Sequence, residues 1–187
     1  LAIEALENGE HVVWATTEQQ ELYRVTGITT NGEIASLMSF DNQSAPLGNE
    51  HVVPFIYRDK LLIGTQNGVL SYQTNTKNKF ELAAFLPASL RTKNKDVFRT
   101  SEDQTGRLWY HAGRDTGVVY ADSNGQLISQ EAMFTPYNQS GTRGLVYFDE
   151  AIWFGVANGK IYRVSQEAIS HIPAAANVAL RYINNIN

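Results

Sequence analysis

Short runs of apolar residues alternate with polar turns along the whole chain. Residues 107–122, RLWYHAGRDTGVVYAD, contain two such runs around a turn, and residues 61–73 (LLIGTQNGVLSYQ) and 151–164 (AIWFGVANGKIYRV) repeat the arrangement. Runs rich in Val, Ile, Tyr and Trp between Gly, Asn and Asp are typical of β-hairpins. The pattern therefore predicts an all-β protein.

The hairpin recurs at a regular interval. Its anchors, one large apolar residue per copy, are Trp14, Ile63, Trp109 and Trp153. They are 49, 46 and 44 residues apart, close to the roughly 40–50 residues of a four-stranded propeller blade. The tyrosines that follow the anchors are Tyr23, Tyr72, Tyr120 and Tyr162. Their offset is nine residues in three copies and eleven in the third, which we attribute to a longer turn at Arg114-Asp115.

Each copy has room for four antiparallel strands. Hairpin tips are expected upstream of the anchors, at Asn8-Gly9, Arg58-Asp59, Thr105-Gly106 and Asp149-Glu150. A fourth strand is expected at 33–37, 80–84 and 126–129. We predict a β-propeller segment of about four blades, at residues 1–47, 48–94, 95–138 and 139–171, with the anchors filling the layers between blades. A β-sandwich with similar strands is the alternative.

The anchors and their turns resemble the two-component regulator propeller repeats. EDQTGRLWYHAGRDTGVVYAD matches the repeat well, the second copy replaces Trp by Ile63, and the first copy, VVWATTEQQELYRV, diverges most. The resemblance implies a periplasmic or other extracytoplasmic sensor region of a membrane-bound receptor, whose output is a histidine kinase or a diguanylate cyclase. Carbohydrate fragments are common inputs in that family. Streptogramin-lyase-like propellers share parts of the same motifs.

The last residues depart from the repeat. In the family the last blade is commonly followed by a three-tyrosine β-sandwich, and residues 172–187 resemble the linker and first strand of that domain. A closing outer strand or a frayed tail is the alternative. Because the chain begins with Leu1, we expect it to be a piece of a longer protein, with any membrane segment outside it.

Composition narrows the possible functions. The formal net charge is −4 without a cluster of Lys or Arg, which argues against a nucleic-acid partner. The chain has no cysteine, which excludes disulfides and thiolate metal sites. No cofactor and no metal are predicted.

Catalytic motifs are not apparent. The four histidines, His11, His51, His111 and His171, have no metal-binding spacing, and no serine lies in a nucleophile elbow. His111 lies beside the Gly113-Arg114-Asp115 turn and is a candidate for a site, although an ordinary polar strand position is the alternative. The acidic residues at 102–103 and 149–150 fit hairpin geometry. We therefore expect a non-catalytic protein.

Ligand binding is better motivated. In a propeller the loops between second and third strands share one face with the loops between blades, and here both kinds are rich in Asn, Gln, Ser and Thr. Amides and hydroxyls beside an aromatic ring suit a sugar, and arginine suits an acidic one. The candidate ligand-binding residues are Gln66, Asn67, His111, Arg114, Asp115, Tyr137, Asn158 and Arg143. The alternative is that these loops are polar because they are solvated.

Four blades are at the lower limit for closing a propeller. Uncovered blades expose aromatic faces and edge strands, so we expect either further blades before Leu1 or self-association. The function predicted is a small-molecule or carbohydrate sensor. The alternatives are a propeller enzyme of the streptogramin-lyase type and a platform for protein–protein interaction.

Overall fold

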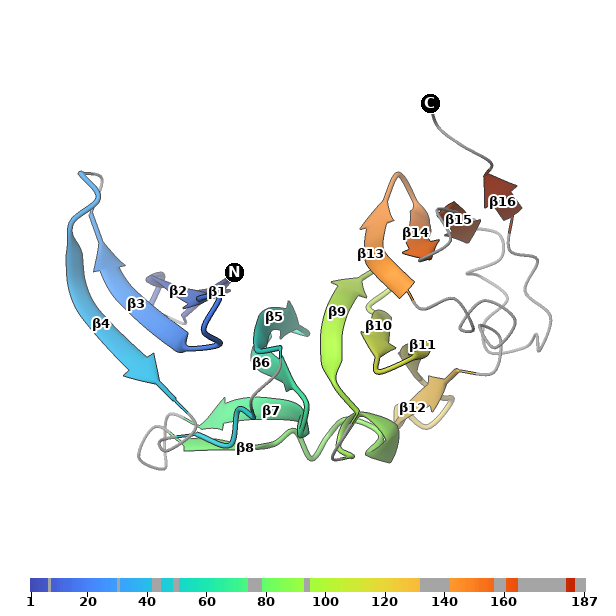
Figure 1. Ribbon diagram of the computed structural model, residues 1–187, viewed down its shortest axis with the longest axis horizontal. Helices are drawn as coiled ribbons and strands as arrows, with labels where there is room; N and C mark the ends of the chain where they lie inside the picture. Colours follow the sequence, from blue (N-terminus) through green and yellow to red (C-terminus); the bar gives the residue numbers. More distant parts are fainter. Residues whose placement is uncertain are drawn as a thin grey trace. The chain divides into compact units, whose positions relative to one another are not determined.

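The computed structural model describes residues 1–6, 8–29, 31–41, 45–48, 51–73, 79–92, 95–131, 142–156, 161–164 and 181–183. These residues form four antiparallel sheets of four strands, and within each sheet every strand pairs with the next in sequence (Figure 1). The chain divides into two compact units, Leu1–Phe98 and Arg99–Asn187. The four-stranded units predicted from the repeat are confirmed.

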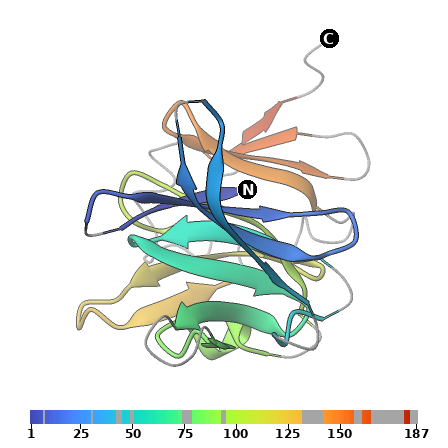
Figure 2. The same cartoon turned by 90° about the vertical axis from the view of Figure 1, so that its left-hand side faces the viewer.

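The strands of the first unit make up sheets 1 and 2. Sheet 1 contains β1 (Ala2–Ala5), β2 (His11–Thr16), β3 (Leu22–Ile28) and β4 (Ile34–Phe40). Sheet 2 contains β5 (Val53–Tyr57), β6 (Lys60–Thr65), β7 (Gly68–Gln73) and β8 (Lys79–Leu82). The long β3–β4 hairpin of sheet 1 is visible in Figure 2 as the upright pair of blue strands.

Sheets 3 and 4 follow. Sheet 3 contains β9 (Val97–Glu102), whose first residues belong to the first unit, then β10 (Leu108–Ala112), β11 (Asp115–Ala121) and β12 (Leu127–Gln130). Sheet 4 contains β13 (Thr142–Phe148), β14 (Ala151–Val156), β15 (Ile161–Val164) and β16 (Arg181–Ile183). A short 3₁₀ turn, η1 (Ala88–Leu90), follows β8 and precedes β9 along the chain.

β16 lies in the stretch that the resemblance assigns to a following domain. It pairs with β15 as the outer strand of sheet 4, with Tyr162 opposite Tyr182. This is the closing outer strand that the sequence left as an alternative. The rest of residues 172–187 lies outside the described residues, so the start of a three-tyrosine domain stays a prediction.

Two hairpin tips have the tight geometry that their sequences predict. Arg58-Asp59 joins β5 to β6 and Asp149-Glu150 joins β13 to β14, each as a two-residue turn. All four residues have positive φ, between 48° and 58°, as the favoured two-residue hairpin turn requires. Because none of the four is glycine, each turn carries a small conformational cost.

The longer turn expected at Arg114-Asp115 is not present. β10 and β11 are joined by the two residues Gly113-Arg114, and β6 and β7 are also joined by two residues. Asp115 already belongs to β11. The two extra residues are in the strands, one between the turn and Trp109 and one between the turn and Tyr120, so the prediction of a longer turn was wrong.

In the first unit, sheets 1 and 2 enclose an aromatic layer. The indole of Trp14 contacts Tyr72 edge-on at 4.9 Å between ring centroids and also contacts Phe40 and Phe80. Ile63 of β6 belongs to the same buried cluster. Pairs of aromatic rings in this geometry add to the stability gained by burial.

The second unit has an equivalent layer between sheets 3 and 4. Trp109, Val118 and Tyr120 of sheet 3 are buried against residues of sheet 4, among them Ile152 and Phe154. Trp14 and Trp109 are both completely buried. Each unit is therefore held together by one apolar layer between two sheets, with a tryptophan inside it.

The four anchors all lie on second strands, but they do not all face the same way. Trp14 and Trp109 point toward the sheet that follows in sequence, whereas Ile63 and Tyr72 point back toward the sheet that precedes. Ile63 is one residue nearer its turn than Trp109, and a shift of one residue moves a strand side chain to the opposite face. Trp153 is outside the buried cluster that contains its neighbours Ile152 and Phe154.

Candidate functional site

In the first unit, the β6–β7 hairpin is fixed by its own polar side chains. The Thr65 hydroxyl donates to the Gly68 carbonyl at 2.8 Å and accepts from the Asn67 amide at 3.0 Å. The Asn67 side-chain nitrogen donates to the Pro46 carbonyl at 3.2 Å, and the Gln66 side chain fills the space where a Cβ at Gly48 would lie. Both candidates, Gln66 and Asn67, thus hold the loop between sheets 1 and 2.

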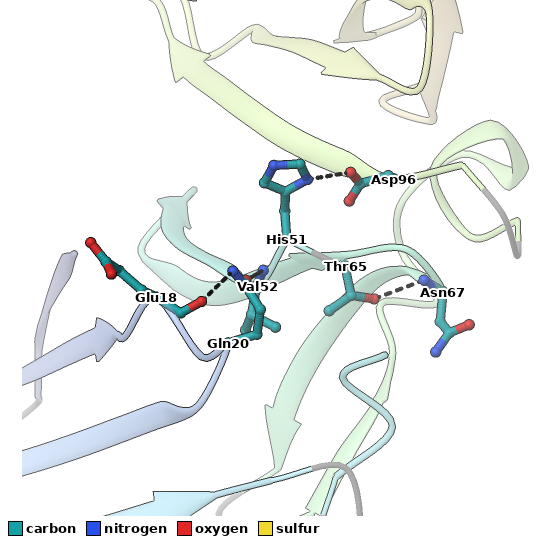
Figure 3. A network of polar contacts seen from close by, with 7 residues as sticks. All are labelled: Glu18, Gln20, His51, Val52, Thr65, Asn67 and Asp96. Carbon is teal, nitrogen blue, oxygen red and sulfur yellow. Dashed lines mark hydrogen bonds and ion pairs between the residues drawn. The ribbon is translucent and has the colours of Figure 1, made fainter. Parts of the chain in front are cut away.

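A second group of contacts links the β2–β3 loop to the start of sheet 2 (Figure 3). The Gln20 side chain accepts a hydrogen bond from the Val52 amide at 2.9 Å and donates to the Glu18 carbonyl at 3.3 Å. Gln20 itself has φ +65°. The Gln20 side chain therefore holds the β2–β3 loop of sheet 1 against the main chain at the start of sheet 2.

His51 lies close to the start of sheet 3. Its Nδ1 is 2.6 Å from Asp96 Oδ2, and its ring stacks on Phe98 with centroids 5.0 Å apart. The His51 side chain is largely exposed. This pair was not singled out in the sequence as a unit, because 45 residues separate its members.

In the second unit, His111 is a buried strand residue. It pairs across the hairpin with Thr116, with 3.2 Å between Nδ1 and Oγ1, and both side chains are almost completely buried. Burial lowers the pKa of His111 from 6.5 to about 4, although the Asp115 carboxylate opposes this change. The imidazole is therefore neutral at pH 7.

The tip of the same hairpin is open to solvent. Gly113 and Arg114 are exposed, and Asp115 is partly exposed. A guanidinium on the turn beside a carboxylate on the first residue of β11 suits recognition of polar or anionic groups. The His111 side chain hydrogen-bonds to the main chain of Gly113 and Asp115 at this turn and is itself buried.

The other candidates are placed as follows. Tyr137 and Asn158 lie outside the described residues, as does His171. Arg143 is in β13, but its side chain is not described. Gln66 and Asn67 belong to the first unit, and His111, Arg114 and Asp115 belong to the second. The structure thus groups the candidates into two hairpins.

An apolar hollow that sequence reasoning missed lies on sheet 4. Its volume is about 460 Å³, and its lining includes Arg99, Val146, Trp153, Gly155 and Ile161. Gly144 of β13 pairs with Gly155 of β14, and the absence of both side chains leaves space at this point of the sheet. These two glycines were the feature of the sequence that could have indicated the hollow. They can be recognised only when the register of the two strands is known.

Within the residues described, no group of three His, Asp or Glu side chains is arranged to hold a metal ion. Among the same residues, no helix is long and apolar enough to span a membrane.

Comparison with known proteins identifies the fold. No family model and no curated protein matches the sequence. The extracellular domain of the one-component system BT4673 from B. thetaiotaomicron is similar over 98% of this chain and 22% of that chain, with 20% identity and a TM-score of 0.61. Streptogramin B lyase is similar over 100% of this chain and 54% of its own, with 15% identity and a TM-score of 0.56.

A third similar structure is the virginiamycin B lyase from Staphylococcus aureus, with 11% identity and a TM-score of 0.53 over 100% of this chain and 70% of that one. This chain therefore spans about half of streptogramin B lyase and about a fifth of the BT4673 domain. These proteins are β-propellers. The four meandering sheets of this chain are thus blades of a β-propeller.

Proposed function

We propose that this chain is a ligand-binding part of an extracytoplasmic sensor and performs no catalysis. The observation that carries the proposal is the similarity to an extracellular domain of a one-component system over nearly the whole chain. The repeat motifs support the same function independently, because they resemble the two-component regulator propellers.

The exposed tip of the β10–β11 hairpin is the contact that we assign to the ligand. Arg114 is exposed there beside Asp115, and arginine binds carboxylates in a fork of two hydrogen bonds. An acidic sugar, such as a uronic acid, presents a carboxylate and several hydroxyls. We therefore propose acidic carbohydrate as the ligand class.

The state of His111 favours binding over catalysis. In the S. aureus lyase, a variant in which one histidine is replaced by alanine is catalytically inactive. His111 is buried, pairs with Thr116 and has a lowered pKa. A general acid or base has to reach the substrate, and a histidine buried beneath its hairpin is poorly placed to do so.

The test is titration calorimetry of the 187-residue chain with galacturonate and glucuronate oligosaccharides, followed by chromatography of the recovered sugar. We expect saturable heat, a weaker affinity in Arg114→Ala, and unchanged sugar. The matched control is Arg58→Ala, which removes an exposed hairpin arginine from the opposite end of a sheet. Cleaved sugar would support the enzyme alternative, and absence of heat with both sugars would contradict the ligand class.

A further inference from the structure

The outer face of sheet 4 is apolar and open. Side chains alternate between the two faces of a strand, so Trp153 and Gly155 lie on the face opposite Phe154, which is buried against sheet 3. Val146 lies opposite Trp153 and is 51% exposed. Most of the residues that line the hollow of about 460 Å³ lie on this face, and Arg99, Leu145 and Phe154 complete its lining.

The Trp153 face of sheet 4 has the same arrangement of side chains as the Trp14 face of sheet 1, which sheet 2 covers. In sheet 1 the row across the strands is Ala2, Trp14 and Arg24, and in sheet 4 it is Val146, Trp153 and Arg163. In both rows the guanidinium lies over the indole, at 5.9 and 5.6 Å from the ring centroid. Trp14 is completely buried by sheet 2, whereas Trp153 is partly exposed.

The glycines of the hollow indicate what fits there. A Cβ at Gly144 or Gly155 would have no described atom within 4 Å. At Gly64 of sheet 2, by contrast, a Cβ would overlap the Val97 carbonyl oxygen at the start of β9. Glycine within a strand often marks the close approach of another backbone, and Gly155 leaves room for a strand that packs on this face.

A surface suited to this face exists elsewhere on the chain. On the side of sheet 1 opposite Trp14, one row of aliphatic residues crosses all four strands: Ile3, Val13, Val25 and Leu37. Ile3 and Leu37 are 56% and 59% exposed. The face of sheet 2 that covers Trp14 has a row of the same kind: Pro54, Ile63, Leu70 and Leu82.

We propose that the Trp153 face of sheet 4 binds the Ile3 face of sheet 1 in a second copy of this chain. The contact reproduces the packing of sheet 2 on Trp14. It joins two different surfaces, so it is heterologous, and it either closes into a ring or continues as a chain of copies.

Sedimentation velocity over a concentration series tests the proposal. The unmodified chain is expected to associate as concentration rises. Gly155→Arg fills the hollow with a charged side chain, and Ile3→Lys places a charge on the opposite surface. Each is expected to weaken association at least roughly tenfold, because a charge buried in the centre of an interface removes a major contact. Val146→Lys repeats the first test at a position that is already exposed.

Mixing the variants distinguishes this geometry from others. A Gly155→Arg copy retains its Ile3 face and an Ile3→Lys copy retains its Trp153 face, so the mixture should form a dimer that neither variant forms alone. The control is Ile34→Lys, which lies on the other face of sheet 1 and is 53% exposed. A chain that stays monomeric, an Ile3→Lys variant that associates normally, or a mixture that fails to pair would each overturn the proposal.

Discussion

The buried carboxylate of Asp103 offers a quantitative test of how sheet 3 is stabilised. Asp103 is 5% exposed and accepts a hydrogen bond from the indole nitrogen of Trp109 at 2.9 Å. It also accepts from the amides of Thr105 and Arg107 and from the Thr105 hydroxyl. The carboxylate therefore closes the β9–β10 hairpin and satisfies a donor that lies inside the apolar layer.

The expected cost of Asp103→Ala follows from these contacts. A hydrogen bond to a charged group contributes roughly 1.5–3 kcal/mol, and an unsatisfied buried donor costs about 1–3 kcal/mol. Water can replace the carboxylate at the exposed turn residue Thr105, but not at the completely buried Trp109. We therefore expect the variant to lose about 3 kcal/mol of unfolding free energy.

The same sheet contains a matched control. Asp122 closes the β11–β12 hairpin with two main-chain hydrogen bonds, from Asn124 and Gln126, both at 2.9 Å and both exposed. Its turn has the same main-chain bonds as the Asp103 turn, with a glycine at φ +78° in place of +74°. Asp122→Ala is therefore expected to cost about 1 kcal/mol.

Urea denaturation followed by far-ultraviolet circular dichroism measures both costs. The contribution of the indole is isolated by repeating Asp103→Ala in a Trp109→Phe background, where no indole donor remains. There the cost of Asp103→Ala should fall to that of Asp122→Ala. Equal costs for the two aspartates in the unmodified chain, or an unchanged cost in the Trp109→Phe background, would refute the reasoning.

Three further predictions concern stability. Gly64→Ala should cost more than about 2 kcal/mol by thermal denaturation because its Cβ overlaps the Val97 carbonyl. In a chain dilute enough to be monomeric, Gly155→Ala should be neutral or stabilising, because its Cβ meets no described atom within 4 Å. Because the pKa of His111 is lowered from 6.5 to about 4, the folded chain favours the neutral imidazole. The contribution of His111 to the free energy of unfolding should be constant above pH 6.5 and fall by up to about 3 kcal/mol toward pH 4. His111→Gln should lack this fall when the free energy of unfolding is measured against pH. Glu150→Gly should raise the free energy of unfolding by about 0.5–1 kcal/mol, because glycine adopts φ +53° without steric cost. The variant should therefore unfold at a higher urea concentration, and an unchanged midpoint would contradict this.

The strand content and the period of the sheets were predictable from local patterns. The turns at Arg58-Asp59 and Asp149-Glu150 were recognised because apolar runs flank them, and a hairpin tip is a property of a few adjacent residues. The four sheets followed from the spacing of the anchors. Local sequence determines these features, because a strand and its turn form largely from neighbouring residues.

The face on which each anchor lies was not predictable in the same way. Counting from one tryptophan to the next ignores the one-residue difference between Ile63 and Trp109 relative to their turns. That difference reverses the face, because side chains alternate along a strand. The hollow at Gly155 was missed for a related reason, since it depends on the register of β13 with β14.

The candidate site was predictable only as a set of polar loops. Sequence identified His111 and Arg114, but not that the first is buried beneath its hairpin while the second is exposed. Gln66 and Asn67 were chosen for their chemistry, and the structure uses both to position the loop between sheets 1 and 2. Burial and inter-sheet contacts are long-range properties that a single sequence pattern does not contain.

The central claim is that pairs of sheets bury one tryptophan within each unit, while the equivalent tryptophan of sheet 4 has its face open. Fluorine NMR of the chain labelled with 5-fluorotryptophan tests this directly, with Trp153→Phe used for assignment. We expect three resonances, of which those of Trp14 and Trp109 do not shift between H₂O and D₂O, whereas that of Trp153 does. A solvent-dependent shift for Trp14 or Trp109, or none for Trp153 in the dilute chain, would contradict the account.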